Sequence, residues 1–328
     1  KELAGTVYVL FQPAEEGPPV GEKGGVPLLI AEGLLERLRP GAMFALHSMP
    51  ALQVGTAGWT PGAEMASSDT FRIVVRGRGS HGAQPHKSID PIVVASQVVM
   101  ALQTIDSRRI DPLQPIVVTI GMLRAGTRFN IIPSEAEMHG TLRTLDENVR
   151  KQGRALIESL STGTAAAHGA TAEVYFDDAS ANPVLLNDEK LAPFGAASLA
   201  RTLGEKNVTR IPPLMVGEDF AHFAQRIPSF YFLLGVGNEK RGITAGLHTA
   251  EIDRAVDLIK QIHADGVTLL VVEHVMKAIK ALSHRIMVLD FGKKIADDAP
   301  DMVLNDPNVI AAYLGQRYMQ RQQEKNEK

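Results

Sequence analysis

The stretch Gln12-Pro13-Ala14-Glu15-Glu16-Gly17 follows the unbroken apolar run Thr6-Val7-Tyr8-Val9-Leu10-Phe11. A run of this length, rich in β-branched and aromatic residues, predicts a strand buried on both faces and therefore a parallel one. Open α/β sheets bind their ligands just beyond the carboxyl ends of such strands. Two adjacent carboxylates are costly there unless a positive charge lies beside them, so Glu15 and Glu16 indicate a metal site. A solvated Glu-Glu pair in a loop is equally compatible with this hexapeptide alone.

Length and composition are those of a globular protein. The 328 residues are 45% hydrophobic and 22% charged, which suits two or three domains. A formal net charge of −3 favours neither nucleic acid nor an anionic membrane as a partner. The absence of cysteine excludes disulfides and thiolate metal ligands. No apolar run is long enough to span a bilayer and no signal peptide opens the chain, so we expect a cytoplasmic protein without membrane insertion.

The residues after the Glu pair predict a βαβ unit. Apolar residues recur at helical spacing from Val26 to Leu38, and Pro40-Gly41 ends this helix. Residues 42–46 then predict a second short buried strand, which ends at His47. Parallel strands of one unit end at the same sheet edge, so we expect Glu16 and His47 to lie side by side. A purely structural histidine at a strand end is the alternative.

A second pattern begins at Asp69, where strands alternate apolar and polar residues. We predict strands from Asp69, over 116–123, over 136–142 and over 172–176, with one helix opened by Asp90-Pro91 and another over 147–168. The order βαββαβ is that of ferredoxin-like domains. We therefore expect residues 68–178 to form a domain inserted into the α/β domain, with one sheet edge able to pair with a second copy. The α/β pattern then returns, with a helix over 191–203, a short strand over 215–220 and another over 229–234.

Seven motifs occur in a fixed order along the chain. They are Gln12-Pro13-Ala14-Glu15-Glu16-Gly17, Ala45-Leu46-His47-Ser48-Met49-Pro50, Gly77-Arg78-Gly79-Ser80-His81-Gly82-Ala83-Gln84-Pro85-His86, Asn130-Ile131-Ile132-Pro133, Gly140-Thr141-Leu142-Arg143, Gly217-Glu218-Asp219-Phe220 and Leu247-His248-Thr249. Over about residues 1–250 this set resembles the aminoacylase, hippurate hydrolase and auxin-conjugate hydrolase branch of the dinuclear-metal amidohydrolases and exopeptidases. Each motif alone carries little weight, but their order makes the resemblance specific.

The resemblance implies a fold, a reaction and a set of site residues. The fold is a zinc-exopeptidase-like mixed α/β sheet with an inserted ferredoxin-like lid that also forms a homodimer. The reaction is hydrolysis of an N-acyl amino acid or peptide-like amide with two divalent ions, Zn²⁺ or Mn²⁺, which His and carboxylate ligands suit. The implied roles are general base for Glu15, oxyanion stabilisation for His81, metal ligation for Glu16, His47 and His248, substrate binding for Asn130 and Arg143, and shaping of the site for Glu218 and Asp219.

Several of these residues have a plain structural alternative. His81 and His86 are compatible with ordinary polar positions in a Gly-rich turn, and Asn130 with the cap of a turn. Arg143 fits the exposed face of an alternating strand, and Glu218-Asp219 fits the N-terminal cap of a helix.

Two departures from the family pattern shape the functional expectation. The family carries a Cys-Gly-His-Asp-type motif upstream of the strand with which this chain begins, so we expect a truncated chain and an incomplete sheet. Residues of about 250–315 resemble instead the end of the ATPase subunit of a branched-chain amino-acid ABC transporter, with a strand over 266–274, a hairpin over 285–296 and His274 as its nucleotide-sensing histidine. No Gly-x-x-x-x-Gly-Lys-[Ser/Thr] phosphate loop occurs in the sequence, so a nucleotide is not expected.

The expected organisation follows from these two resemblances. The catalytic α/β domain covers residues 1–67 and 179–252, the inserted domain 68–178, the ABC-like fragment 253–315 and a polar tail 316–328. Besides a metal-dependent amidohydrolase, the sequence is compatible with a catalytically inactive chimera that keeps only a dimerisation module. An ABC ATPase fragment is the least favoured of the three.

Overall fold

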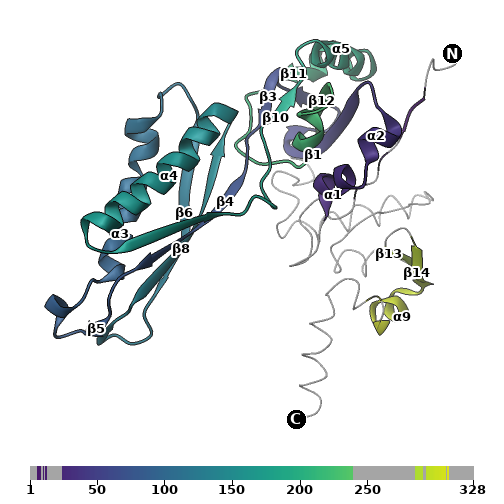
Figure 1. Cartoon of the computed structure of the whole chain (residues 1–328). Helices are drawn as coiled ribbons and strands as arrows, with labels where there is room; N and C mark the ends of the chain where they lie inside the picture. Colours follow the sequence, from purple (N-terminus) through teal and green to yellow (C-terminus); the bar gives the residue numbers. More distant parts are fainter. Residues whose placement is uncertain are drawn as a thin grey trace. The chain divides into compact units, whose positions relative to one another are not determined.

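A computed structural model describes residues 6–8, 10, 12, 24–238, 285–290, 293–307 and 309 (Figure 1). The described residues fall into two compact units. One holds residues 6–8, 10, 12, 24–48 and 55–234, and the other holds residues 49–54 and 235–238 together with the described C-terminal residues. The first unit contains every candidate site residue that the structure describes.

A four-stranded mixed sheet forms the centre of the α/β part. Its strand order is β1-β12-β2-β11, built from β1 (Met43–Gln53), β2 (Ala57–Trp59), β11 (Val208–Arg210) and β12 (Ser229–Gly237). Strand β11 runs parallel to β2, whereas β12 is antiparallel to β2. Helix α5 (Leu191–Leu203) packs its small residues Ala192 and Ala196 against Trp59 and Phe230 of this sheet. A two-stranded sheet of β3 (Gly62–Met65) and β10 (Leu185–Asn187) lies in the same part of the chain.

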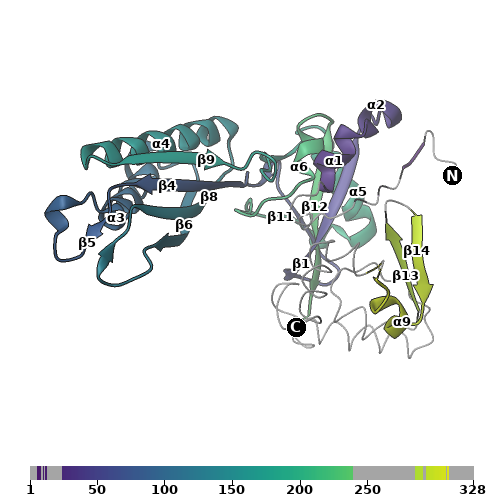
Figure 2. The ribbon, with the colours of Figure 1, turned by 60° about the horizontal axis from the view of Figure 1, so that its bottom comes forward.

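The inserted residues form a separate antiparallel sheet with helices on one face (Figure 2). Along the chain the elements are β4 (Asp69–Arg76), α3 (Pro91–Leu102), β6 (Ile116–Ala125), β8 (Glu135–Thr144), α4 (Glu147–Ala167) and β9 (Thr171–Phe176). The strands lie in the order β6-β8-β4-β9, which with two crossing helices is the split-βαβ arrangement. Its core joins the inward side chains of the sheet to those of α3 and α4, among them Phe71, Ile73, Val98, Met138 and Ile157.

Local sequence signals explain both helices of the insert. The Asp90 carboxylate accepts a hydrogen bond from the Ile92 amide, and Pro91 occupies the first turn of α3. Asp146 caps α4 in the same way, through the amides of Asn148 and Val149. The remaining pair of short strands, β5 (Ser80–His81) and β7 (Ile131–Ile132), lies at the end of the insert away from its connections to the α/β part (Figures 1 and 2).

Two predictions about the start of the α/β part are wrong. Residues 6–8, 10 and 12 are not in a strand, and Val7 and Tyr8 are 70% and 56% exposed, because none of the described strands pairs with them. The helix predicted from Val26 to Leu38 is two helices, α1 (Gly25–Ala31) and α2 (Leu34–Leu38), because Gly33 takes the left-handed backbone that ends the first one.

The second strand is longer and less buried than the sequence predicted. Strand β1 continues six residues beyond His47, so this histidine lies inside a strand and not at its end. Phe44 and Leu46 are 55% and 52% exposed, since β1 is an edge strand in the described sheet. Residues 215–220, predicted as a strand, form a loop.

The described C-terminal residues form a hairpin of β13 (Ile286–Asp290) and β14 (Lys293–Asp298), followed by α9 (Pro300–Leu304). The predicted hairpin over 285–296 is therefore present, whereas the predicted strand over 266–274 lies outside the described residues. Within the described part of the chain, no helix is both long enough and apolar enough to cross a bilayer.

Candidate functional site

The loop before helix α6 (Ala221–Ala224) places two carboxylates where distant parts of the chain meet. Glu218 and Asp219 are each only 7% exposed. The Val26 amide at the start of α1 donates to Asp219 Oδ2 at 2.8 Å, and the Gln12 side-chain amide donates to Asp219 Oδ1 at 2.9 Å. Asp219 therefore ties the residues that precede Glu15 to the start of α1 and to α6.

The Glu218 carboxylate is held from two sides. The Tyr231 hydroxyl, on β12, donates to Oε2 at 2.7 Å, and the Phe220 amide donates to Oε1 at 3.2 Å. Burial raises the pKa of Glu218, and Asp219 raises it further, whereas the two hydrogen bonds and the nearby His47 lower it. Because both oxygens already accept hydrogen bonds, this side chain is suited to shaping the site and orienting neighbours.

The His47 ring has a defined tautomer. Its Nδ1 lies 2.6 Å from the Ser48 carbonyl oxygen. A carbonyl oxygen only accepts, so Nδ1 carries the hydrogen and Nε2 of the neutral ring keeps its lone pair. A backbone carbonyl that fixes one nitrogen while the other is left to ligate is the usual arrangement of metal-binding histidines. His47 thus fits a divalent cation.

His81 and Asn130 come together at the β5–β7 end of the insert. His81 pairs with Ile131 in the strand register, and the Gly82 amide donates to the Asn130 carbonyl at 2.8 Å. The Ala83 amide donates to His81 Nδ1 at 3.2 Å, so the neutral ring carries its hydrogen on Nε2 and offers a donor there. His81, Ile131, Ile132 and other residues line a pocket of about 610 Å³.

Arg143 lies at the opposite end of strand β8 from this pocket. Its Nη1 donates to the Met215 carbonyl at 3.4 Å, in the loop that leads to Glu218. The side chain is partly buried, so it is more than the exposed face of an alternating strand. The structure thus sets Glu218 and Asp219 side by side in one loop, brings His47 close enough to Glu218 for their charges to interact, and brings Arg143 to the same loop. It pairs His81 with the Asn130 region elsewhere.

The other predicted site residues, Glu15, Glu16, His248 and the nucleotide-sensing His274, lie outside the described residues. Across the described residues no group of three or more His, Asp or Glu side chains is arranged to hold a metal ion. Of the three predicted metal ligands, His47 is the one that lies among the described residues.

Sequence reasoning missed two partners of the acidic pair. Gln12 was noted only as part of a motif, whereas its side-chain amide donates a hydrogen bond to Asp219. Tyr231 carried no signal at all, because a tyrosine in an apolar strand is ordinary, and only the fold brings its hydroxyl to Glu218. The signal that could have identified Gln12 as a partner is its position three residues before Glu15 in the same motif.

The sequence matches peptidase family M20/M25/M40 over residues 1–265, which is most of the chain. The chain belongs to this family. M20 membership places it in a family of hydrolases and agrees with the mixed α/β fold. Residues 293–318 match a different family, the branched-chain amino acid ATP-binding cassette transporters, so the expected second resemblance is confirmed as well.

Relatives of this M20 chain carry names of amide hydrolases. Thermostable carboxypeptidase 2 of Saccharolobus solfataricus is 33% identical over 89% of this chain and 67% of its own length. N-acetylcysteine deacetylase of Bacillus subtilis is 39% identical over 71% of this chain and 59% of its own. The solved structure of the Bacillus subtilis YXEP protein, a dinuclear metal binding peptidase from the M20 family, has a TM-score of 0.55 and 33% identity over 69% of this chain and 54% of its own. This chain spans about half to two thirds of the length of these relatives.

Proposed function

We propose that this M20 chain derives from a metal-dependent amidohydrolase that cleaves the amide bond of an N-acyl amino acid or a similar peptide-like substrate with a free carboxylate. The observation that carries the proposal is His47, whose Nδ1–H is tied to the Ser48 carbonyl and whose charge is felt by the buried Glu218. The names of the carboxypeptidase and deacetylase relatives support the same reaction class.

The position of Gln12 supports a role for the Glu15-Glu16 pair. Gln12 hydrogen-bonds Asp219, and Glu16 follows Gln12 by four positions in the sequence. We assign Glu15 as the base that takes a proton from the attacking water and returns it to the leaving amine.

Divalent ions fit the donors that are present. Glu16, His47 and His248 would hold them, as Zn²⁺ or Mn²⁺, and His47 has the tautomer that ligation requires. When bound, such ions polarise the scissile carbonyl and lower the pKa of water. Asp219 would keep Gln12 in place, Glu218 would supply negative charge near His47, and Arg143 would bind the substrate carboxylate with its planar fork.

Hydrolysis assays over a panel of N-acyl amino acids test this function. Glu15→Gln should abolish turnover, whereas Glu158→Gln, a change at an exposed position of α4, should leave it unaltered. Calorimetric titration with Zn²⁺ or Mn²⁺ should show binding that Glu16→Ala removes. Turnover that is unchanged in Glu15→Gln would refute the assigned base.

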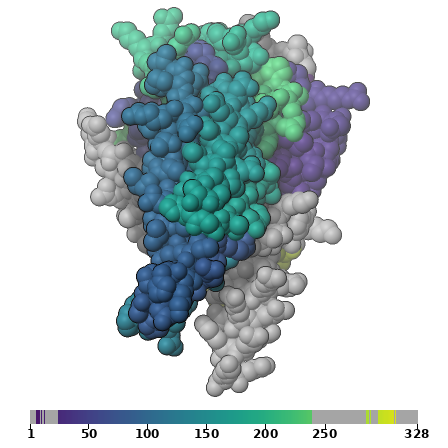
Figure 3. All heavy atoms as spheres, turned by 60° about the vertical axis from the view of Figure 1, so that its left-hand side comes forward, coloured from purple at the N-terminus to yellow at the C-terminus, as the bar shows by residue number. Residues whose placement is uncertain are grey.

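The insert offers a reason to expect that two copies act together. Strand β5, which carries His81, lies at the end of the insert away from its connections to the α/β part (Figure 1), and we infer that His81 Nε2 serves the oxyanion of a second copy. We propose that edge strand β6 pairs with β6 of that copy. Helix α3, which contacts β6, exposes Ile92, Val93 and Met100 on its outer side, and α3 and α4 lie side by side on this face in Figure 3.

Sedimentation separates the enzyme from its main rival, a non-catalytic chimera that keeps only the dimer. Val93→Lys should dissociate the dimer and, if His81 acts across it, should also reduce turnover. A dimer that binds no divalent ion and hydrolyses no substrate would favour the non-catalytic module. A chain that is a monomer at every concentration would contradict the proposed pairing.

A further inference from the structure

Two connections join the insert to the α/β part, and they pair with each other. Residues 66–68 lead into β4, and residues 177–184 lead out of β9. The Ser68 amide donates to the Asn182 carbonyl at 2.9 Å, and the Asn182 amide donates back to Ser68 at 3.0 Å. The two connections therefore form one short antiparallel bridge and not two independent linkers.

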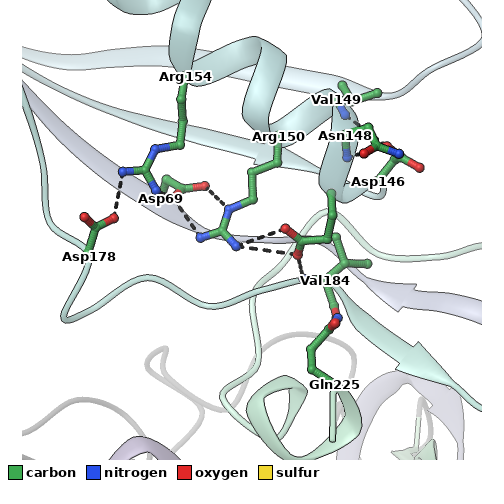
Figure 4. Close-up of polar contacts among 10 residues, drawn as sticks. Asp69, Asp146, Asn148, Val149, Arg150, Arg154, Asp178, Val184 and Gln225 are labelled. Carbon is green, nitrogen blue, oxygen red and sulfur yellow. Dashed lines mark hydrogen bonds and ion pairs between the residues drawn. The ribbon is translucent and has the colours of Figure 1, made fainter.

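An ion cluster closes this bridge on the side of the insert (Figure 4). Asp69 is 1% exposed at its side chain and receives two hydrogen bonds from Arg150, from Nε at 2.7 Å and Nη2 at 2.9 Å. Arg154 joins Asp69 at 3.3 Å and Asp178, on the second connection, at 2.7 Å. A forked guanidinium on a buried carboxylate is among the strongest and most directional polar contacts available. Helix α4 is thereby held to the first residue of β4 and to the second connection.

Val184 links this cluster to the α/β part. The Val184 amide donates to Glu147 Oε1, at the start of α4, at 2.8 Å. The Val184 carbonyl accepts from the Gln225 side-chain amide, also at 2.8 Å. Val184 is 1% exposed, and Figure 4 shows it between Arg150 and Gln225. The amide of Val184 is thus bound by the insert, and its carbonyl is bound by Gln225 at the end of α6.

The same bridge touches the acidic loop at its other end. A Cβ added at Gly217 would lie 2.7 Å from Ser68 Cβ, so the backbone just before Glu218 packs directly on the connection. Helix α6 runs from this loop to Gln225, only seven residues after Glu218. The segment that carries Glu218 and Asp219 therefore contacts the connections on both sides, at Gly217 before the loop and at Gln225 after it.

We propose that Glu147 and Gln225 are positioning residues, which clamp Val184 and so set the orientation of the insert, with Arg143, relative to the Glu218–Asp219 loop. The placement of the clamp rests on contacts alone, whereas its consequence for substrate rests on the proposed function. Neither residue touches substrate in this scheme. Their effect passes through the backbone of the connection and through α6.

A distance measurement between spin labels tests the clamp without requiring activity. The chain has no cysteine, so Ala166→Cys at the end of α4 and Arg201→Cys on α5, both exposed, give one labelled pair. Glu147→Ala and Gln225→Ala should each broaden the distance distribution. Glu147→Gln keeps an oxygen that can accept from the Val184 amide, so it should keep the narrow distance distribution of the unmodified chain. Glu158→Ala, on the exposed face of α4, should also leave the distribution unchanged.

Hydrogen exchange provides a second readout at the bridge itself. Loss of a buried hydrogen bond of this kind should speed exchange of the Val184 and Asn182 amides by about tenfold, while the core strands β4 and β8 keep their protection. If hydrolysis is detected, the two alanine variants should raise KM for a substrate with a free carboxylate more than they lower kcat.

The possible outcomes separate the two proposals. Broader distances and faster exchange in a chain that hydrolyses nothing would support the clamp and count against the function. Distances and exchange identical to those of the unmodified chain, in both Glu147→Ala and Gln225→Ala, would overturn the clamp even in an active enzyme.

Discussion

Glu64 is expected to make this protein less stable as the pH rises. The side chain lies on β3 and is fully buried, and its Oε2 accepts hydrogen bonds from the Thr60 amide and, at 3.1 Å, from Asn187. Its Oε1 has no partner among the described residues. Burial raises the pKa of Glu64 from 4.5 to about 7, although the hydrogen bonds from Thr60 and Asn187 lower it. The protonated form is therefore the one that the fold prefers.

The size and sign of the effect follow from linkage. Between pH 4.5 and about 7 the native state keeps a proton that the unfolded chain has released, so the free energy of unfolding falls as the pH rises through this range. At 1.36 kcal/mol for each pH unit, the full difference is about 3 kcal/mol, an order-of-magnitude figure. This loss of stability is absent below pH 4.5 and complete above pH 7.

Urea denaturation at pH 5, 6, 7 and 8 measures this loss. Trp59 is the only tryptophan of the chain, is 6% exposed and precedes Thr60, so its fluorescence reports on the region that holds Glu64. Between pH 5 and pH 8 the unmodified chain should lose up to about 3 kcal/mol of its free energy of unfolding through Glu64. Glu64→Gln should not show this loss. The exposed change Glu158→Gln should follow the unmodified chain. A Glu64→Gln variant with an unaltered pH dependence would refute the reasoning.

Three further predictions concern the insert and α6. Asp69→Asn removes the buried negative charge that faces Arg150, and should cost about 3–5 kcal/mol in urea unfolding; a loss below about 1 kcal/mol would contradict a buried ion pair. Gly140→Ala places a Cβ 2.5 Å from the Phe71 ring and should cost about 1–3 kcal/mol by the same assay, whereas a neutral result would show that β8 can shift. Burial lowers the pKa of His222 from 6.5, so its contribution to stability should be lost as the pH falls below 6.5; His222→Gln should remove that loss, and an unchanged acid limb would argue against it.

The insert could be predicted from the sequence because its signals are local. Alternating residues mark β4 and β8, and Asp90-Pro91 and Asp146-Glu147 mark the starts of the two helices. Each signal is contained within a few residues, and the antiparallel strands need partners only from the same 110-residue stretch. Order and type of these elements therefore follow from periodicity and capping.

The α/β part could not be predicted in the same way. The apolar run that begins at Thr6 has the composition of a buried strand, but a strand exists only where another strand accepts its hydrogen bonds. The strand predicted over residues 42–46 likewise looked buried, yet its neighbours in the described sheet leave Phe44 and Leu46 half exposed. Composition reports what a segment can bury, and not what lies next to it.

The sequence by itself determined the family, through motifs whose order along the chain requires no folding to recognise, and it supplied the residue types that hydrolysis needs. Only the tertiary structure decided which of them meet. Gln12, Val26 and Asp219 are joined across about 200 residues, and Glu147 and Gln225 meet at one backbone unit. These contacts are set by where buried polar groups find partners, a condition that depends on the whole fold because an unpaired buried group is costly wherever it lies in the chain.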